Sequence, residues 1–453
     1  MLKLKKATTI EEIRKYCTPK PLAEEDLEQF YINTNKARNL EEDIFNKLKN
    51  RVTAEVENRI LFCGHKGCGK STELNNLKKK LKQEMFCVSF SVHSECNMFT
   101  LKAEELLLVI AERLVASAKD AGLKINDKSL QDIYDYFAKE SRLEESEIKA
   151  GIEAGGGVAA DKSIIGNLLG LLAYIKTDIK LGSRALQTTE SVLIKRPSAL
   201  LLKINQLIEK IKAGLPEGKK LLIIVEDLDK LNLAVARDIF INNCAFLKIN
   251  ASVIYTIPIF LFYAPDAQAC RNNFDSDISL PMIKIKEIDG KENNESFKII
   301  KEIINARLDE KLIDDDALNM LIEKTGGVLR HCFEALQKAS ETNSALQEKK
   351  LGAKQIEYGL NRLGDNLWRQ VAPPYDPPPS GVVKIEELYK RLSDYYKIEE
   401  SKEAIAPSPD VINQILLMSS ALIEYINGEE RFVVHPILEK RIKKLKWYRE
   451  IVE

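Results

Sequence analysis

The sequence predicts an α/β protein in which helices cover both faces of a parallel sheet. Short apolar runs of strand length alternate with amphipathic segments over most of the first 293 residues, as in strand–helix–strand units. One run, "RILFC", breaks into the glycine-rich stretch "GHKGCGKS", and a helical pattern starts at Lys70. From about residue 294 the pattern turns wholly helical. We therefore expect a sheet domain followed by helical units.

Composition excludes several classes of protein. The chain has 453 residues, which is too long for one ordinary core and predicts two or three domains. Hydrophobic residues make up 45% and charged residues 30%, so the chain is expected to be globular rather than disordered. The 68 basic residues balance the 68 acidic ones, so any attraction to nucleic acid or to a membrane has to be local.

Cysteine usage and hydropathy give two further expectations. The eight cysteines form no CxxC pair, and the N-terminal stretch lacks the apolar segment of a signal peptide, which predicts a reducing cytoplasm. The longest uncharged runs span residues 163–175 and 249–265, short of the roughly 18 to 20 apolar residues that a spanning helix needs. We therefore expect no transmembrane segment.

The stretch from Gly64 to Ser71 fits GxxxxGK[ST], the phosphate-binding loop. Glycines let consecutive N–H groups turn toward one anion, and the N-terminus of the following helix adds its positive dipole end. A connecting turn alone would not require Lys-Ser at its end. We expect Lys70 to neutralise the β- and γ-phosphates of a nucleotide and the Ser71 hydroxyl to bind Mg²⁺. The expected phosphate-binding residues are Gly64, His65, Lys66, Gly67, Cys68, Gly69, Lys70, Ser71 and Thr72.

Acidic residues end a second apolar run, in "KKLLIIVEDLDKLN". The run predicts a buried parallel strand from which Glu226, Asp227 and Asp229 emerge at the C-terminal edge of the sheet, where open α/β sheets bind ligands. Together with the upstream loop, this strand is a Walker B candidate. We assign Glu226 to the metal and Asp227 to the attacking water, and the reverse assignment stays open. The expected metal ligands are Ser71, Glu226 and Asp227.

An insertion separates these two motifs. A helix at residues 70–83, a strand "MFCVSFSV" and a helix "TLKAEELLLVIAERLVASAKD" are predicted first. An inserted subdomain follows at about residues 122–200, where "SEIKAGIEAGGGVAAD" and "YIKTDIKLGSRAL" are predicted to form the two strands of a hairpin. We expect a small subdomain that packs on the core and whose use is partner binding. The alternative is a sensor, an oligomerisation element or an element that touches a membrane.

Past the acidic strand, "LAVARDIFINNCAFLKI" predicts a helix. The segment "ASVIYTIPIFLFY" predicts a strand with Thr256 at its exit, and "LPMIKIKEI" predicts the last strand. In the helical part, Gly326-Gly327 separates two helices and Arg330 opens the second. Because an arginine at a helix start opposes the helix dipole, it needs an anionic partner. That partner is either a nucleotide phosphate or a surface carboxylate.

The C-terminal part begins with a proline-rich linker, "APPYDPPPSG". Two helices, a hairpin around Asn427-Gly428 and a helix "PILEKRIKKLKWYRE" follow, which is the order of a winged helix. Its basic and aromatic residues could meet nucleic-acid phosphates, although such charge runs are more often solvated faces. These residues are Lys440, Arg441, Lys443, Lys444, Lys446, Trp447, Tyr448 and Arg449.

With "FYINTNKARNLEEDIFNKL" before the loop, these motifs resemble signal-transducing P-loop ATPases. The similarity is to the STAND and KAP branch and to origin-recognition-type AAA+ proteins, over roughly residues 28–345. By this resemblance Thr256 is similar to a sensor 1 residue and Arg330 to a sensor 2 residue. The acidic pair is Glu-Asp rather than Asp-Asp or Asp-Glu, and "GGVLR" lacks the STAND proline. Arg237 and Arg271 are the candidates for an arginine finger.

The resemblance implies a domain order and a set of catalytic residues. We expect an N-terminal segment, a parallel-sheet P-loop NTPase core with helices on both faces, a helical lid, and a linker with a winged-helix-like domain. The expected ranges are 1–27, 28–293, 294–371 and 372–453. The catalytic residues implied are Lys70, Glu226, Asp227, Thr256 and Arg330.

The implied function is an ATP-hydrolysing molecular switch that needs ATP and Mg²⁺, forms homo-oligomers and controls a protein effector. "GHKGCGKSTEL" with "VEDLDK" also resembles bacterial ATPases found beside anti-phage defence genes. An alternative is an ATP-dependent loader that binds nucleic acid through the winged helix. The acidic strand end and the helical lid argue against a third option, a nucleoside kinase.

Overall fold

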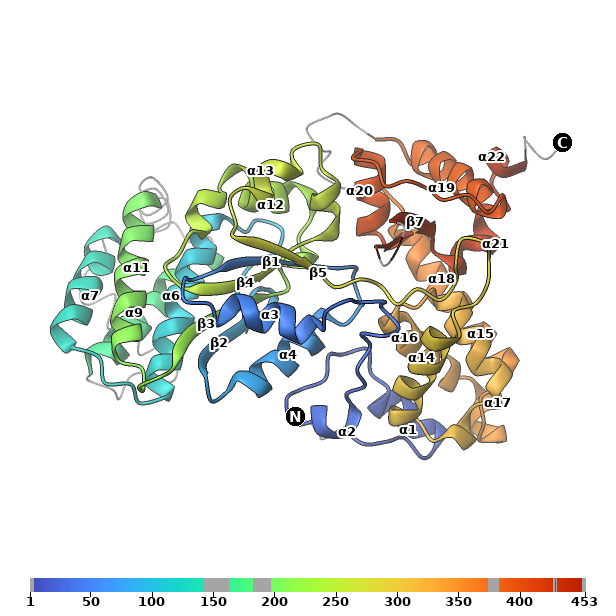
Figure 1. The fold of residues 1–453 in the computed structure, drawn as a ribbon, viewed down its shortest axis with the longest axis horizontal. Coiled ribbons are helices and arrows are strands. Elements are labelled where there is room, and N and C mark those ends of the chain that lie inside the picture. Colours follow the sequence, from blue (N-terminus) through green and yellow to red (C-terminus); the bar gives the residue numbers. More distant parts are fainter. Residues whose placement is uncertain are drawn as a thin grey trace.

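The computed structural model describes residues 4–141, 163–181, 197–373, 383–426, 428 and 430–449 (Figure 1). A sheet domain with an added helical layer forms one side of the molecule, and a helical lid with the C-terminal domain forms the other (Figure 1). Across these residues, no helix is both long and apolar enough to cross a membrane.

The core is a five-stranded parallel sheet of order β2-β3-β4-β1-β5, which confirms the predicted fold class. Its strands are β1 (Arg59–Cys63), β2 (Met85–Ser91), β3 (Lys220–Glu226), β4 (Ser252–Thr256) and β5 (Ser276–Ser279). In the register, Leu61 lies opposite Tyr255 and Val225 opposite Tyr255 from the other side. The carboxyl ends of the strands therefore meet at one edge, where the glycine-rich loop and the acidic residues both lie.

The two faces of the sheet bury alternate side chains, as parallel strands covered by helices require. Ile60, Phe62 and Ile224 pack with α3 (Ile44–Val52) and α4 (Lys70–Leu81). The alternate residues of the same strands belong to the larger core that includes α6 (Ala103–Asp120). The sheet is thus covered on both faces, as the sequence predicts.

The insertion is helical where the structure describes it. It contributes α7 (Asp127–Ser141), α9 (Ile164–Leu181) and α11 (Pro197–Ala213), with α9 packed on α6 and α7 (Figure 1). The predicted strand at residues 174–186 is therefore wrong over 174–181, because Leu168, Leu171, Leu172 and Ile175 are buried at helical spacing. The other predicted strand, residues 146–161, and residues 182–186 lie outside the described residues.

The last strand is also placed differently from the prediction. It is β5, four residues upstream of the predicted start at residue 280, and it pairs with β1. Residues 280–285 are apolar because they run under the lid, where the Ile283 carbonyl lies against Gly327 and the Pro281 carbonyl accepts a hydrogen bond from Arg38. Burial by the lid, not by strand pairing, explains the apolar pattern.

Two predicted helices are broken into short pieces. Residues 233–249 form α12 (Leu233–Arg237), a π-helical turn (Asp238–Asn242) and a 3-10 helix (Cys244–Leu247). After the C-terminal hairpin come a 3-10 helix (Pro436–Leu438), α21 (Glu439–Ile442) and α22 (Lys446–Arg449). Tighter hydrogen bonds from Lys444 to Arg441 and from Leu445 to Ile442 end α21 there.

The lid consists of α14 (Asn294–Arg307), α15 (Asp315–Thr325), α16 (Leu329–Ser340), α17 (Asn343–Glu348) and α18 (Ala353–Gln370). The N-terminal segment belongs to it, because α1 (Ile10–Tyr16) packs on α16 and Ala7 pairs with Leu308. The short helix α2 (Leu27–Phe30) contacts α14.

The C-terminal domain has α19 (Ile385–Glu400), α20 (Val411–Met418) and an antiparallel hairpin of β6 (Leu422–Tyr425) and β7 (Arg431–Val434). Two helices followed by a hairpin are the predicted winged-helix order. The hairpin contacts the sheet domain at His65 and Tyr263 and the lid at Gly326.

Gly327 gives a test of how closely the lid packs on the core. Its φ is 75°, and a Cβ there would lie 2.1 Å from the Ile283 carbonyl oxygen. Gly290 has a similar φ of 85° but open space around it. Both alanine variants carry the left-handed backbone cost of about 1–2 kcal/mol, and only Gly327→Ala adds a clash. We expect Gly327→Ala to lower the urea midpoint of unfolding clearly more than Gly290→Ala; equal losses would contradict this packing.

Candidate nucleotide-binding site

A cavity of about 360 Å³ lies at the carboxyl edge of the sheet, between the glycine-rich loop, the lid and the N-terminal segment. Its volume falls within the roughly 300–1,000 Å³ of small-molecule sites. One end is polar, lined by Gly67, Gly69 and Lys70 and by the acidic residues after β3. The apolar lining residues are Leu22, Phe30, Ile32, Leu329 and Phe333. The cavity therefore combines an anion-binding end with apolar lining.

The loop takes its shape from three glycines with positive φ. Gly64, Gly67 and Gly69 have φ values of 152°, 85° and 113°, and Gly69 caps α4. A Cβ at Gly64 would lie 2.7 Å from the Leu280 carbonyl oxygen, and one at Gly67 would lie 2.7 Å from the Arg330 Cβ. Glycine is therefore required both by the backbone conformation and by the neighbouring chain.

Lys70 lies inside the loop with its side chain only 5% exposed. Its ammonium donates to the Gly64 carbonyl at 2.8 Å and to the His65 carbonyl at 3.2 Å. It also forms an ion pair of 2.9 Å with Asp229. Burial alone would lower the pKa of Lys70, but Asp229 outweighs it and the pKa is raised. Lys70 therefore carries a full positive charge at the polar end of the cavity.

Glu226 and Asp227 line the same end but have different partners. Burial raises the pKa of Glu226, although the nearby Ser71 hydroxyl lowers it in part, and the carboxylate accepts a hydrogen bond of 3.4 Å from the Ser89 hydroxyl. Asp227 has a φ of 69°, accepts a hydrogen bond from Ser91 and pairs with Lys230 at 2.6 Å. The Asp227 carboxylate is also close enough to Glu226 to help raise the pKa of that carboxyl.

The donor atoms at this end fit Mg²⁺. Ser71 and Glu226 lie side by side, and both offer the hard oxygen atoms that Mg²⁺ prefers. Within the described part of the chain, no group of three His, Cys, Asp or Glu residues could hold a metal without other ligands. A nucleotide site does not need one, because phosphate and water oxygens complete the magnesium shell.

Arg330 comes from the lid and lies against the loop. It is the second residue of α16; its backbone N–H donates to the Gly67 carbonyl at 3.4 Å, and its side chain lines the cavity. Its guanidinium is close enough to Asp229 to help lower the pKa of that carboxyl. The anionic partner that the sequence required for Arg330 is thus available in the cavity.

Thr256 lies just behind the cavity. Its hydroxyl donates to the Val225 carbonyl at 3.3 Å and accepts from the Leu228 N–H at 3.2 Å, and the residue is 1% exposed. In this arrangement Thr256 supports the end of β3 and is not among the residues that line the cavity in the described chain.

The remaining loop residues divide between the cavity and the structure around it. Thr72 lines the cavity, and its hydroxyl accepts a hydrogen bond from the Leu22 N–H at 3.3 Å. Gly64, Lys66 and Cys68 are not among the lining residues of the described chain. His65 points away from the cavity, with its ring nitrogen 3.0 Å from the Leu422 carbonyl oxygen of β6.

Sequence reasoning missed three charged residues of the site. Asp229 was noted at the strand end but given no role, and its pairing with Lys70 has no local signal. Arg38 is fully buried and donates to the Cys68 carbonyl at 2.5 Å. Arg307 lies over the Phe333 ring at 5.0 Å and bonds to the Thr18 carbonyl. Arg38 and Arg307 are far from the motifs in sequence, so only the fold brings them there.

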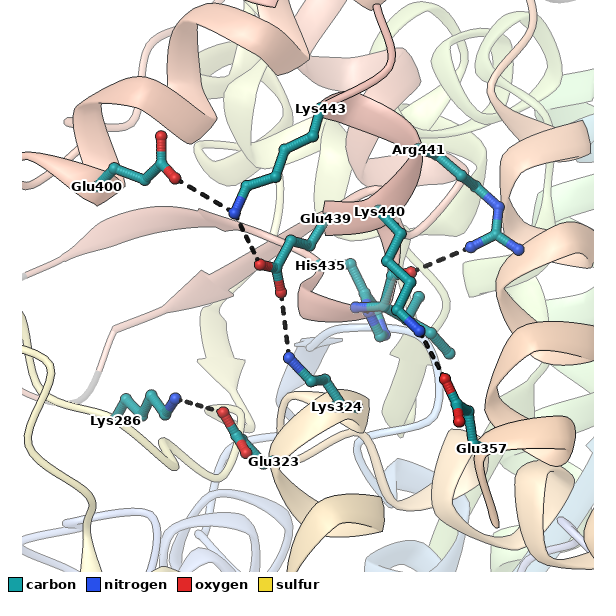
Figure 2. A network of polar contacts seen from close by, with 11 residues as sticks. Lys286, Glu323, Lys324, Glu357, Glu400, His435, Glu439, Lys440, Arg441 and Lys443 are labelled. Atoms are coloured by element: carbon teal, nitrogen blue, oxygen red, sulfur yellow. Dashed lines mark hydrogen bonds and ion pairs between the residues drawn. The ribbon is translucent and has the colours of Figure 1, made fainter. Parts of the chain in front are cut away.

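Several arginines and lysines proposed for other roles are paired with acids. Arg237 pairs with Asp266 at 2.5 Å, and Arg271 lies over Phe262 at 4.6 Å. Lys440 pairs with Glu357 of the lid at 2.7 Å (Figure 2). Other such pairs in the C-terminal domain are Lys443 with Glu400 and Glu439, and Arg441 with Asp365.

No family model and no curated protein matches the chain. Distant matches to solved structures were found. The chain is similar to the ORC2 protein of Aeropyrum pernix, with 12% identity, 97% of both chains covered and a TM-score of 0.43. Cdc6p of Pyrobaculum aerophilum has 11% identity, coverage of 94% of this chain and 96% of that chain, and a TM-score of 0.37. The RuvB Holliday junction branch migration motor of Thermotoga maritima has 11% identity, coverage of 88% and 93%, and a TM-score of 0.32. Similarity at this level carries no functional conclusion, which has to come from the site.

The fold and the site together define a class. A parallel sheet, a glycine-rich loop at the start of α4 and acidic residues at the end of β3 form the core of a P-loop NTPase, with a helical lid and a winged-helix-like domain after it.

The two acidic residues are expected to differ in their mutant phenotypes. Asp227→Asn should bind Mg-ATP but turn it over roughly a hundredfold more slowly, because it removes the base for the attacking water. Glu226→Gln should bind Mg-ATP less well than the unaltered protein does, with a smaller effect on metal-free ATP, because Glu226 and its neighbour Ser71 are the expected metal ligands. Calorimetric titration with and without Mg²⁺ measures nucleotide binding, and steady-state kinetics measure turnover. Together they distinguish the two phenotypes. The exposed Glu302 provides a matched Glu→Gln control. The reverse pattern would exchange the two roles.

Proposed function

We propose that the chain binds ATP with Mg²⁺ and hydrolyses it as a molecular switch. The observation that carries this proposal is the cavity in which Lys70 of the loop, the acids after β3 and Arg330 of the lid meet. A site that only needed to hold phosphate would not require an arginine from a separate helical unit. The contact of Arg330 with the loop instead makes the lid part of the site.

In this proposal each side of the cavity has its own task. The loop backbone, the N-terminus of α4 and Lys70 bind the β- and γ-phosphates. Ser71 and Glu226 hold Mg²⁺, which when bound supplies positive charge against the phosphate oxygens. Asp227 accepts a proton from the attacking water, and the contacts of its carboxylate with Ser91 and Lys230 orient it for this.

The apolar lining of the cavity suits a nucleobase. Phe30, Ile32, Leu329 and Phe333 offer a largely apolar lining, while the Tyr31 hydroxyl is occupied by a hydrogen bond of 3.0 Å to Glu73. Stacking and burial of a flat ring are favourable in such surroundings. The choice of adenine within this proposal rests on the resemblance of the segment before the loop to that of related ATPases.

The C-terminal domain contacts both the loop and the lid, which supports a switch. From the hairpin, the Tyr425 hydroxyl donates to the Gly326 carbonyl at 2.9 Å, and the Leu422 carbonyl faces His65 of the loop. Next to it, the rings of His331 and His435 are joined by a hydrogen bond of 2.9 Å. A change in the angle of the lid would therefore reach the C-terminal domain directly.

In the hydrogen bond between His331 and His435, the donor is His435. The Nδ1 atom of His435 accepts from the Ile437 N–H at 3.2 Å, so its Nε2 atom carries the hydrogen and donates to His331. Burial lowers the pKa of His435 to about 3, so the ring stays neutral. Ion pairs surround this joint, including Lys324 of α15 with Glu439 of α21 at 3.1 Å (Figure 2).

The rest of the proposal concerns assembly and setting. We include a homo-oligomer and a protein effector, which rest on the resemblance to signal-transducing P-loop ATPases. A role in anti-phage defence rests on the resemblance of "GHKGCGKSTEL" and "VEDLDK" to ATPases found beside defence genes. A reducing cytoplasm agrees with the eight free cysteines. Nucleic-acid loading is less well supported, because Lys440, Arg441 and Lys443 are already paired with carboxylates.

A substitution of Arg330 provides a test of the switch. If the lid senses the γ-phosphate through this residue, hydrogen exchange over residues 294–345 should be slower with ATP than with ADP. Arg330→Ala should reduce that difference in protection more than it lowers nucleotide affinity. The exposed Arg362, on α18, provides a matched control, since its alanine variant should keep the difference. Equal protection with ATP and ADP in the unaltered protein would contradict the switch.

A further inference from the structure

Asp229 is a third acid of the site with no role in the function proposed above. It lies in the 3-10 turn Leu228–Lys230 that follows Asp227, lines the cavity, and has a side chain only 13% exposed. Its Oδ2 atom is 2.9 Å from the Lys70 ammonium nitrogen. Asp229 therefore pairs with the same ammonium group that a nucleotide phosphate is expected to bind.

All three N–H donors of the Lys70 ammonium have partners. An ammonium group has three donors, and those of Lys70 reach the Gly64 carbonyl, the His65 carbonyl and Asp229. The two carbonyls belong to the backbone of the loop itself. Asp229 is the partner with a movable side chain at the cavity wall, so a phosphate that binds Lys70 has to replace Asp229.

The charges around Asp229 also indicate that it occupies the place of an anionic ligand. Burial would raise the pKa of Asp229, but Lys70, followed by Lys230 and Arg330, lowers it, so the carboxyl is ionised at neutral pH. Asp229 also helps to hold the charge of Lys66. One carboxylate therefore offsets several cations at the end of the cavity that is suited to an anion.

We propose that Asp229 sets the affinity of the site for nucleotide phosphates by competing with them for Lys70. This inference rests on the proposed nucleotide site. Asp229 acts through Lys70 and is an affinity-setting residue. An ion pair that only supports the structure makes the opposite prediction, because its removal would leave Lys70 poorly held and would weaken binding.

The test is calorimetric titration of the full-length chain with ADP, which avoids turnover. Asp229→Asn keeps the shape and a neutral acceptor for Lys70, so ADP should bind roughly tenfold more tightly, the range of one charge-assisted hydrogen bond. Adenosine, which has no phosphate, should bind unchanged. Asp229→Glu restores the charge and should restore the lower affinity.

Two further variants complete the design. Asp277→Asn removes the same charge from an exposed residue outside the cavity and should leave ADP affinity unchanged. Asp229→Ser, whose hydroxyl can also accept from Lys70, replaces the asparagine variant if that variant does not fold, and it should also bind ADP more tightly.

The outcomes separate this inference from the function on which it rests. If the unaltered protein binds ADP and the folded Asp229 variants bind it equally or more weakly, competition for Lys70 is overturned while the nucleotide site stands. If adenosine gains as much affinity as ADP, the effect does not pass through phosphate and the inference is again overturned. If the unaltered protein binds no ADP, both the site and the inference fail.

Discussion

The buried ammonium of Lys70 is the group on which the rest of the site depends. Its contacts with the Gly64 and His65 carbonyls fix the loop after β1, and its ion pair with Asp229 ties that loop to the turn after β3. Two strands that are not neighbours in sequence are thus joined at one charge. Because the pair is buried, removing either partner would leave the other with less compensating charge, so the contact constrains both sides.

The same loop also carries the neighbouring units. Its glycines leave room for Arg330 of the lid at Gly67 and for the Leu280 carbonyl at Gly64. His65, which points away from the cavity, contacts β6 of the C-terminal domain. One short segment therefore meets the cavity, the lid and the hairpin, and a movement of any of these has to be accommodated by the others.

Local chemistry decided what the sequence could predict. The loop and the acidic strand end were predictable because Gly69, Lys70 and Asp227 lie within a few residues of each other or of a strand. The predicted hairpin strand at 174–181 was wrong because polar and apolar residues also alternate along part of α9. The apolar run at 280–285 predicts a strand because burial under the lid leaves the same pattern as strand pairing. Arg38 and the pairing of Asp229 with Lys70 depend on tertiary contacts that no local pattern records.

The most direct test of the proposed site is the binding and turnover of ATP by Lys70→Ala, with Lys82→Ala as a control because Lys82 is exposed near the end of the same helix. Circular dichroism has to show that both variants are folded, since Lys70→Ala leaves Asp229 without its main partner. The account predicts that Lys70→Ala loses ATP binding or turnover, because the charge against the β- and γ-phosphates is gone, while Lys82→Ala keeps both. Turnover by folded Lys70→Ala at the rate of the unaltered protein would contradict the assignment of the site.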